Sequence, residues 1–578
     1  MSRKEDAKRL ARTLSHLRPE QAAHRARLRS QKLALSRGPA MFERRWTRDV
    51  SDDAGWPAGF VPIDAADPPL LGSIGDLADH RFSLVGESHC IDDAGGWRPD
   101  ERSQLFRYAL HYFEWAWTLA AEPGDSAREE GRAAFADLWR SWRAGTTFGQ
   151  WDEWSPYVVS LRAWVLCGVF ESLVRGSDIE DDVRQQIGLH AGFVAANLEL
   201  DVGGNHLIKN LKALIGLGIF VGDDELVERG RSLLGAEIER QVLPDGGHYE
   251  RSPSYHCQVL GDLIDVRRVL WASNQTQVVG LEDAVTRMRR WLGAMRMPDG
   301  DVPLFGDATL VGLARIDALG PIPRVRPEGS DPLTHLAESG YVVCRPDDRL
   351  HVIVDVGPPC PPDLPAHAQA GCLAFVAAVD GKRAIVDTGV STYVGDRRAY
   401  ERATKAHNTV EVGEIDQTEV WSSFRAGRLA TPTVHDVYEK GGVLVVDASH
   451  DGYHHLDGAP THRRRFEIGD GRIMLRDSVD GEGFHRLFSR LFLAPGIDAE
   501  LNEDGQGPDV VSSFANFSTS CAGEKVPAWI VFASVAQSFG ERVACRSLWW
   551  EIWEDLPQQF VTEIILGEPN RSDESGTP

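Results

Sequence analysis

The spacing of apolar residues along the 578-residue chain changes its period twice. Between about residues 101 and 300, apolar and aromatic side chains recur every three or four positions, which predicts amphipathic helices. The predicted helices span 104–121, 157–175, 186–200, 206–221, 224–241, 254–272 and 280–297. Gly, Asp and Pro separate them, so short loops should join consecutive helices into antiparallel hairpins. This region therefore predicts a helical toroid or bundle.

From about residue 335 the pattern consists of short β-branched runs separated by turn residues. Examples are HVIVDV, VLVVD and LWWEIW. Such runs predict the strands of an antiparallel sandwich, so the chain should be all-α first and all-β afterwards. The predicted divisions are 1–39, a basic helical segment that we expect to be solvated; 40–330, the helical domain with a loop-rich entry; 331–566, the sandwich; and 567–578, a disordered tail.

Composition and charge exclude several classes of protein. The length fits more than one core, and the net charge of −24 argues against nonspecific nucleic-acid binding. Eight scattered cysteines without a CxxC pair fit neither a disulfide framework nor a zinc–thiolate site. Residues 1–32 lack the apolar run of a secretory signal, and no run looks long enough to span a bilayer. A cytoplasmic location is the default expectation, and a homo-oligomer stays open.

Two clusters in the helical region carry residues suited to catalysis. DVGGNHLIKNLKAL contains Asn205 and His206, of which Asn205 could equally cap the helix that follows. LPDGGHYERSPSYH lies between two predicted helices, where catalytic groups often concentrate. Its candidate residues are Glu250, Arg251, Tyr255 and His256. Structural alternatives are an ion pair between Glu250 and Arg251 and a packing role for Tyr255.

Two further clusters lie in the β-rich region. A proline-rich loop carries His367 to the start of a strand, and prolines stiffen such loops. The segment 387–407 is the best local basic patch for an anionic ligand, and the run 463–465 would extend it. Its polar residues include Asp387, Tyr393, Arg397, Arg398, Tyr400, Arg402, Lys405 and His407. No GxSxG, P-loop or HExxH motif occurs.

Several of these strings together resemble the heparinase II/III-like family of polysaccharide lyases. They are NHLIKNLKAL, QVLPDGGHYERSPSYH, HAQAGCLAF, IVDTGVSTY, YERATKAHNTVEV and WSSFRAGR. The resemblance implies an incomplete α/α toroid followed by an antiparallel β-sandwich, with the active cleft between them. It also implies cleavage of an acidic polysaccharide by β-elimination beside a uronic acid.

The resemblance assigns roles to individual residues. Asn205 or His206, helped by Arg402, would neutralise the uronate carboxylate. Tyr255 and His367 would be the base and the acid, in an order that the sequence leaves open. Tyr400 would be a further active-site tyrosine. The substrate contacts would include Glu250, Arg251, His256 and Trp421.

The resemblance also implies a structural zinc site in the sandwich, at Asp387, His407 and Gln369. Gln369 stands where the family has a histidine, and glutamine is a poor zinc ligand. The chemistry itself requires no cofactor. Two alternatives to a lyase stay open: a catalytically reduced glycan-binding protein associated with polysaccharide biosynthesis, and a toroidal glycoside hydrolase.

Overall fold

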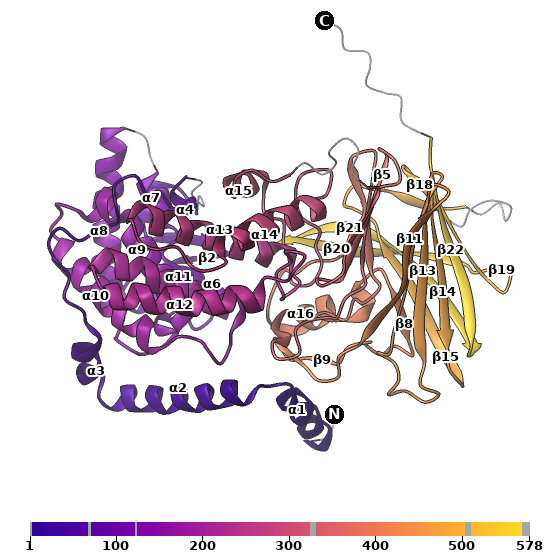
Figure 1. The fold of residues 1–578 in the computed structure, drawn as a ribbon, viewed down its shortest axis with the longest axis horizontal. Helices are drawn as coiled ribbons and strands as arrows, with labels where there is room; N and C mark the ends of the chain where they lie inside the picture. The colour runs from indigo at the N-terminus through magenta and orange to yellow at the C-terminus, as the bar shows by residue number, and fades with distance from the viewer. Residues whose placement is uncertain (1–2, 67–70, 122–123, 324–330, 503–509, 569–578) are drawn as a thin grey trace, which may run out of the picture.

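The computed structural model describes residues 3–66, 71–121, 124–323, 331–502 and 510–568. Figure 1 shows helices gathered in one half of the molecule and sheets in the other, in the order of the chain. This arrangement confirms the predicted change from α to β. The first strand of the β half begins at Leu333, after the last helix of the α half ends at Ala318.

Antiparallel helices build the first half. They are α6 (Gln104–Tyr112), α7 (Ala116–Ala120), α8 (Asp125–Gly145), α9 (Pro156–Val169), α10 (Glu180–Ala196), α11 (Gly204–Val221), α12 (Asp224–Gln241), α13 (Pro253–Ala272), α14 (Leu281–Met295) and α15 (Leu313–Ala318). The predicted helix 104–121 is broken, because Phe113 has a left-handed φ of 66° that ends α6. The sequence prediction also missed α8, which buries Phe135, Trp139 and Trp142 in the core.

The expectation about membrane-spanning segments needs one correction. Within the described residues, the helical stretch Pro156–Val174 is long and apolar enough to cross a bilayer. Its apolar window is 72% buried inside the protein, as in the core helix of a globular domain. Length and composition therefore do not distinguish it from a membrane helix, whereas its burial accounts for its apolar character.

Antiparallel sheets build the second half. One sheet contains β3 (Leu333–Leu336), β4 (Tyr341–Cys344), β5 (Leu350–Asp355), β6 (Phe375–Val379) and β7 (Lys382–Ile385) in that order. In the largest sheet, neighbouring strands follow the order β11 (Pro432–Lys440), β12 (Val443–His450), β13 (Thr461–Gly469), β14 (Arg472–Asp480), β22 (Gln558–Leu566), β18 (Ala515–Cys521), β17 (Val510–Ser512) and β16 (Ala499–Leu501). A short strand, β19 (Glu524–Lys525), pairs with β18. The third has the order β20 (Ala528–Ser538), β21 (Glu541–Asp555), β15 (Phe484–Phe492), β8 (Val410–Val412).

The inward faces of these sheets share one apolar core, to which Phe375, Phe466, Leu487 and Trp550 contribute. Each large apolar side chain buried there stabilises the fold by about 1.5–3 kcal/mol. The basic run 463–465 lies in β13 and is not part of a basic patch. Arg464 is fully buried against Asp477, while its two neighbours pair with Asp447 on the other face of the strand.

The basic N-terminal segment is docked on the protein, which corrects the expectation of a solvated helix. It forms α1 (Arg3–Ser15), α2 (Pro19–Arg37) and α3 (Pro39–Trp46), which run along both halves in Figure 1. Arg12 pairs with Glu419 of the β half at 2.5 Å. Gln21 donates to the backbone carbonyls of Asp201 in the α half and Asp363 in the β half. The segment thus connects the two halves outside their main contact.

Candidate active site

A cavity of about 580 Å³ lies where the helical half meets the sheets. Side chains of both halves line it. The helical half contributes Tyr108, Tyr112, Tyr157, Asn205, His206, Glu250, Tyr255 and Gln258, among others. The sheet half contributes Leu364, Ala366, His367, Ser391, Thr392, Tyr393, Phe424 and Phe539, among others. The mixture of apolar and aromatic walls with a few converging polar groups is typical of a ligand site.

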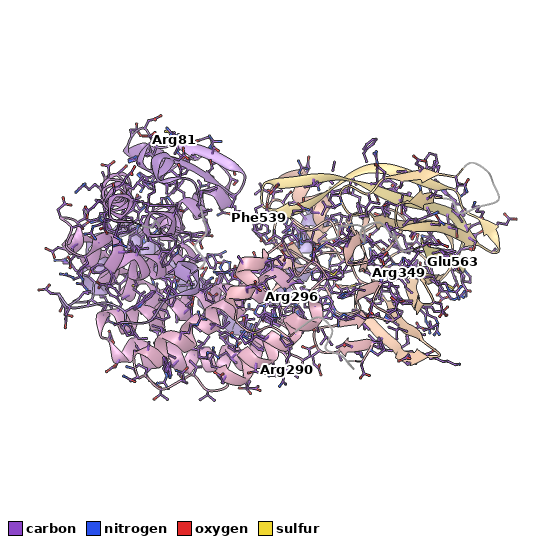
Figure 2. The ribbon with its side chains drawn as sticks, turned by 90° about the horizontal axis from the view of Figure 1, so that it is seen from above. Arg81, Arg290, Arg296, Arg349, Phe539 and Glu563 are labelled. Atoms are coloured by element: carbon purple, nitrogen blue, oxygen red, sulfur yellow. The ribbon has the colours of Figure 1, made fainter. Side chains whose placement is uncertain are left out.

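Two hairpin tips meet beside the cavity. One is the turn of β1 (Arg81–Leu84) and β2 (Glu87–Cys90), and the other is the turn between β20 and β21. A Cβ added to Gly86 would lie 2.5 Å from the Cα of Gly540, so only glycine permits this approach. Figure 2 shows Phe539, which precedes Gly540, at the boundary of the two halves, across from the region that carries Arg81. The tips bridge the cavity on one side.

His367 is held by a buried carboxylate. It ends a short 3-10 turn, Pro365–His367, and its Nδ1 lies 3.0 Å from Oδ2 of Asp307. Burial alone would raise the pKa of Asp307, but Arg398, at 2.5 and 2.6 Å, and His367 hold that pKa well below its usual range. The ionised carboxylate accepts a hydrogen bond from Nδ1, and the other ring nitrogen, Nε2, lies 3.7 Å from Oε2 of Glu250.

Tyr255 lies against this histidine from the helical side. It stands in the first turn of α13, and its ring centroid lies 4.2 Å from that of His367. Its hydroxyl is 2.5 Å from the hydroxyl of Tyr393. Burial raises the pKa of Tyr255 well above its usual value, and the carboxylate of Asp307 raises it further although the Tyr393 hydroxyl lowers it. Tyr255 is therefore held as a neutral hydroxyl in this environment.

Asn205 is fixed by Glu250 at the start of α11. Its backbone N–H and its Nδ2 each donate to a carboxylate oxygen of Glu250 at 2.8 Å. The preceding Gly204 has φ of 57°, and a Cβ there would collide with Glu250, which explains the second glycine of DVGGN. The buried Asn205 Oδ1 has no hydrogen-bond partner among the described residues. Asn205 does not cap the helix through its side chain, and Glu250 does not pair with Arg251.

His206 lies on the same wall, one residue further along α11. Its Nδ1 is 3.2 Å from Oε1 of Glu199, and its ring stacks at 4.2 Å on Tyr157. Burial opposes protonation, but the Glu199 carboxylate outweighs it and raises the pKa of His206. The imidazolium form is thereby favoured, and it offers a charged donor to an anionic group in the cavity.

Three predicted substrate contacts have structural partners instead. Arg251 donates to Asp355 at 2.6 Å and to the carbonyl of Ser339. His256 bonds to the carbonyl of Met288 and stacks on Trp291, and burial lowers its pKa to about 3. Trp421 lies under α1, where its Nε1 donates to Thr13. None of the three is among the described residues that line the cavity.

Arg402 and Tyr400 also lie outside the cavity lining. Arg402 is 1% exposed, and its guanidinium donates to backbone carbonyls. Those carbonyls belong to Ala368, Ser422, Pro365 and Arg425. Tyr400 lies on α16 (Gly395–Arg402) beneath the side chains of Arg397 and Lys405. The tyrosine of this segment that reaches the cavity is Tyr393, which ends the string IVDTGVSTY and was not chosen from sequence.

The residues of the implied zinc site do not fit a zinc ion. His407 Nδ1 lies 3.0 Å from both oxygens of Asp387, so these two groups bind each other. Gln369 instead donates to Asp307 at 2.9 Å. No group of three His, Cys, Asp or Glu side chains suited to a metal occurs in the described part of the chain. A structural zinc needs about four such ligands.

Two family models match the chain. "Heparinase II/III N-terminus" matches residues 77–317, and "Heparinase II/III-like, C-terminal" matches residues 328–565. The chain belongs to the heparinase II/III-like family. The crystal structure of heparinase III has the same fold, with a TM-score of 0.71 at 18% identity over 92% of this chain and 89% of that one. This likeness confirms the α/α toroid followed by the antiparallel sandwich.

Two curated relatives carry different names. FtsZ-localized protein C of Caulobacter vibrioides is 28% identical over 445 residues, which are 70% of this chain and 72% of that protein. A heparin-sulfate lyase of Pedobacter heparinus is 24% identical over 372 residues, 57% of this chain and 55% of the lyase. This family member thus resembles both a lyase and a protein named for its location.

Proposed function

We propose that the protein is a polysaccharide lyase that cleaves a uronate-containing glycan by β-elimination. The proposal is carried by one observation: Asn205, His206 and Tyr255 from the toroid meet His367 and Tyr393 from the sandwich around a single cavity. Family membership is consistent with this chemistry. The side chains around the cavity are of the types that could serve as the donors, base and acid of this reaction.

The surroundings of Tyr255 and His367 favour one division of roles. Asn205 and His206 would bind the uronate carboxylate, which makes the neighbouring C5 proton more acidic. Nε2 of His367 would accept that proton, because the Asp307 carboxylate holds Nδ1 as the donor. The released electron pair forms the C4–C5 double bond, and the C4–O4 bond breaks. Tyr255, whose pKa is raised, would give its proton to the departing O4.

The charge of the cavity favours a glycan without sulfate groups. Among the described residues, no lysine or arginine lines it. The arginines expected to bind the anion are instead bound to protein groups: Arg398 to Asp307 and Arg402 to backbone carbonyls. Sulfates need close cations for tight binding. We infer that the substrate carries carboxylates but little or no sulfate.

The test is an ultraviolet assay for the conjugated enoate that β-elimination creates. Purified full-length protein is incubated with hyaluronan, alginate and desulfated chondroitin, each beside a sulfated counterpart where one exists. We expect absorbance to rise with an unsulfated glycan and much less with its sulfated form. If no glycan gives absorbance although at least one binds, the lyase proposal fails. Equal rates with sulfated glycans would refute the charge argument alone.

A second candidate is a glycan-binding protein without turnover. Its support is the relative named FtsZ-localized protein C, whose name states a location and no reaction. Binding of a uronate glycan that is equal in wild type and His367→Ala, with no product from either, would favour it. A glycoside hydrolase is less well supported, because the carboxylates lining the described cavity are Glu87 and Glu250, and Glu250 is held by Asn205. Incorporation of labelled water oxygen into the product would favour the hydrolase.

A further inference from the structure

A second concave surface lies on the sheet half, away from the cavity. It is a groove of about 560 Å³ on the outer face of the sheet β20-β21-β15-β8. Its lining residues are Lys405, Glu411, Glu414, Arg486, Phe488, Arg490, Trp529, Val531, Trp549 and Glu551. None of these also lines the cavity. The opposite face of the same strands packs into the core through residues such as Leu487 and Trp550.

Aromatic side chains form the floor of this groove in register. Trp529 of β20 lies opposite Trp549 of β21, which lies opposite Arg490 of β15. Trp529 is 62% exposed, and Trp553, which adjoins the groove four residues beyond Trp549 on the same face of β21, is 54% exposed, with Arg486 over its ring at 4.6 Å. Four residues of strand extend the aromatic row by about 13 Å. An exposed indole such as that of Trp529 is costly in water and suits a flat, partly apolar ligand.

The charges of the groove balance, and its two arginines are held in ion pairs. Three cations, Lys405, Arg486 and Arg490, accompany three carboxylates. Arg486 pairs with Glu414 and Glu551, and Arg490 pairs with Glu411 at 2.7 Å. An equal number of opposite charges gives no preference for a polyanion. The ligand that fits this charge pattern is uncharged.

Arg490 adds a second, independent indication of a ligand. Its side chain is 4% exposed and is enclosed by Phe488 and Trp549, with ring centroids at 4.5 and 4.8 Å. Its Nε and Nη1 have no hydrogen-bond partner among the described residues. Buried donors of this kind are normally satisfied, so two unused donors beside a groove point to a partner from outside the chain.

We propose that this groove binds an uncharged sugar chain, with a sugar ring stacked on Trp529, the chain extending toward Trp553 beyond the lining, and hydroxyls bonded to the Arg–Glu pairs. Sugar hydroxyls can bond to these groups while water keeps access to the ion pairs. A protein surface would have to bury the pairs completely, and the desolvation of buried ion pairs is costly. The groove would hold a neutral segment of glycan independently of any reaction in the cavity.

Calorimetric titration of the full-length protein with cellohexaose and with the N-acetylglucosamine hexamer tests the proposal. Wild type should bind at least one of them, and Trp529→Ala/Trp553→Ala should raise its Kd about tenfold or more. Trp271→Ala is the matched control, because Trp271 is 79% exposed on α13 and lies outside the groove. The single Trp529→Ala substitution provides a second variant if the double one melts early.

Three outcomes would overturn the proposal: no binding of either hexasaccharide by wild type, an unchanged Kd in the groove variants, or self-association of wild type in sedimentation that the groove variants lose. The last result would make the face an interface between copies. His367→Ala should keep the affinity of wild type, and neutral hexasaccharides have no uronate to eliminate. Failure of the lyase proposal therefore leaves this test unaffected.

Discussion

Two buried histidines of the sandwich each face a carboxylate at 3.0 Å, yet their surroundings differ. His367 faces Asp307 and lines the 580 Å³ cavity, whereas His407 faces Asp387 in a pocket of about 20 Å³. Asp307 is also bound by Arg398, so its carboxylate is fixed from two sides. Both imidazoles lie against a carboxylate, but of the two only His367 lines a cavity of a size that could admit a substrate. Access for a substrate distinguishes them.

The largest expected effect separates the two histidines by activity. His367→Ala should lower kcat on an unsulfated uronate glycan about 10²–10⁴-fold, because it removes the proposed base. His407→Gln should retain most of the rate, since no substrate atom can reach it. His435→Ala, an exposed histidine bonded only to Ser449, controls for the loss of an imidazole. A His367→Ala enzyme with more than a tenth of the wild-type rate would contradict the comparison.

The next effect concerns stability. Asp307→Asn should lower the free energy of unfolding by about 3–5 kcal/mol, because it leaves Arg398 buried without its anion. The lowered pKa of Asp307 means that its stabilisation is present above the unfolded pKa of about 3.9 and is lost as the pH falls. Urea unfolding across the acid range should therefore be less pH-dependent in the variant. If Asp307→Asn lowered the free energy of unfolding no more than Asp387→Asn does, the two carboxylates would not differ in their contribution to stability.

A third effect concerns Tyr255, whose ring lies against His367. Tyr255→Phe should lower kcat about 10²-fold, because it removes the proposed proton donor while the ring remains against His367. Tyr400→Phe should leave kcat unchanged, since Tyr400 lies outside the cavity lining. Initial rates with both variants, beside thermal melting to check folding, decide the matter. An equal loss of kcat in the two variants would mean that Tyr400 does belong to the active site.

The smallest expected effect concerns another histidine–carboxylate pair, His206 and Glu199. The raised pKa of His206 means that its cationic form, the proposed donor to the uronate, is present at low pH and is lost as the pH rises through that pKa. Glu199→Gln removes the stabilising carboxylate, so KM should begin to rise at a lower pH than in wild type. KM measured from pH 5 to pH 9 checks this. An unchanged pH profile would exclude His206 as the charged donor.

The sequence predicted the fold where periodicity was strong and failed where side chains followed tertiary contacts. The helices α11 to α14 were predicted nearly to their ends. The strand β13 was not, because the run 463–465 looks like a surface patch until Asp477 and Asp447 are seen on opposite faces. Such pairings join residues distant in sequence, so no local pattern reports them.

The candidate site divides in the same way. Residues in the first turn of a helix, such as Asn205 and Tyr255, reach the cavity as the sequence suggested. Arg402 does not, because four carbonyls around it lie in segments that only the fold brings together. Tyr393 was named in the basic segment, but the active-site role went to Tyr400, because both tyrosines belong to one polar segment. Only the course of the loop before α16 distinguishes them.

The contact between Gly86 and Gly540 has a consequence for how a long glycan is handled. While the hairpin tips touch, a polymer cannot be laid into the cavity from that side. A chain passing beneath the tips could not leave on that side. If the proposed lyase activity holds, such a chain would be cut at successive repeats before release. The same two glycines would then link the shape of the rim to processivity.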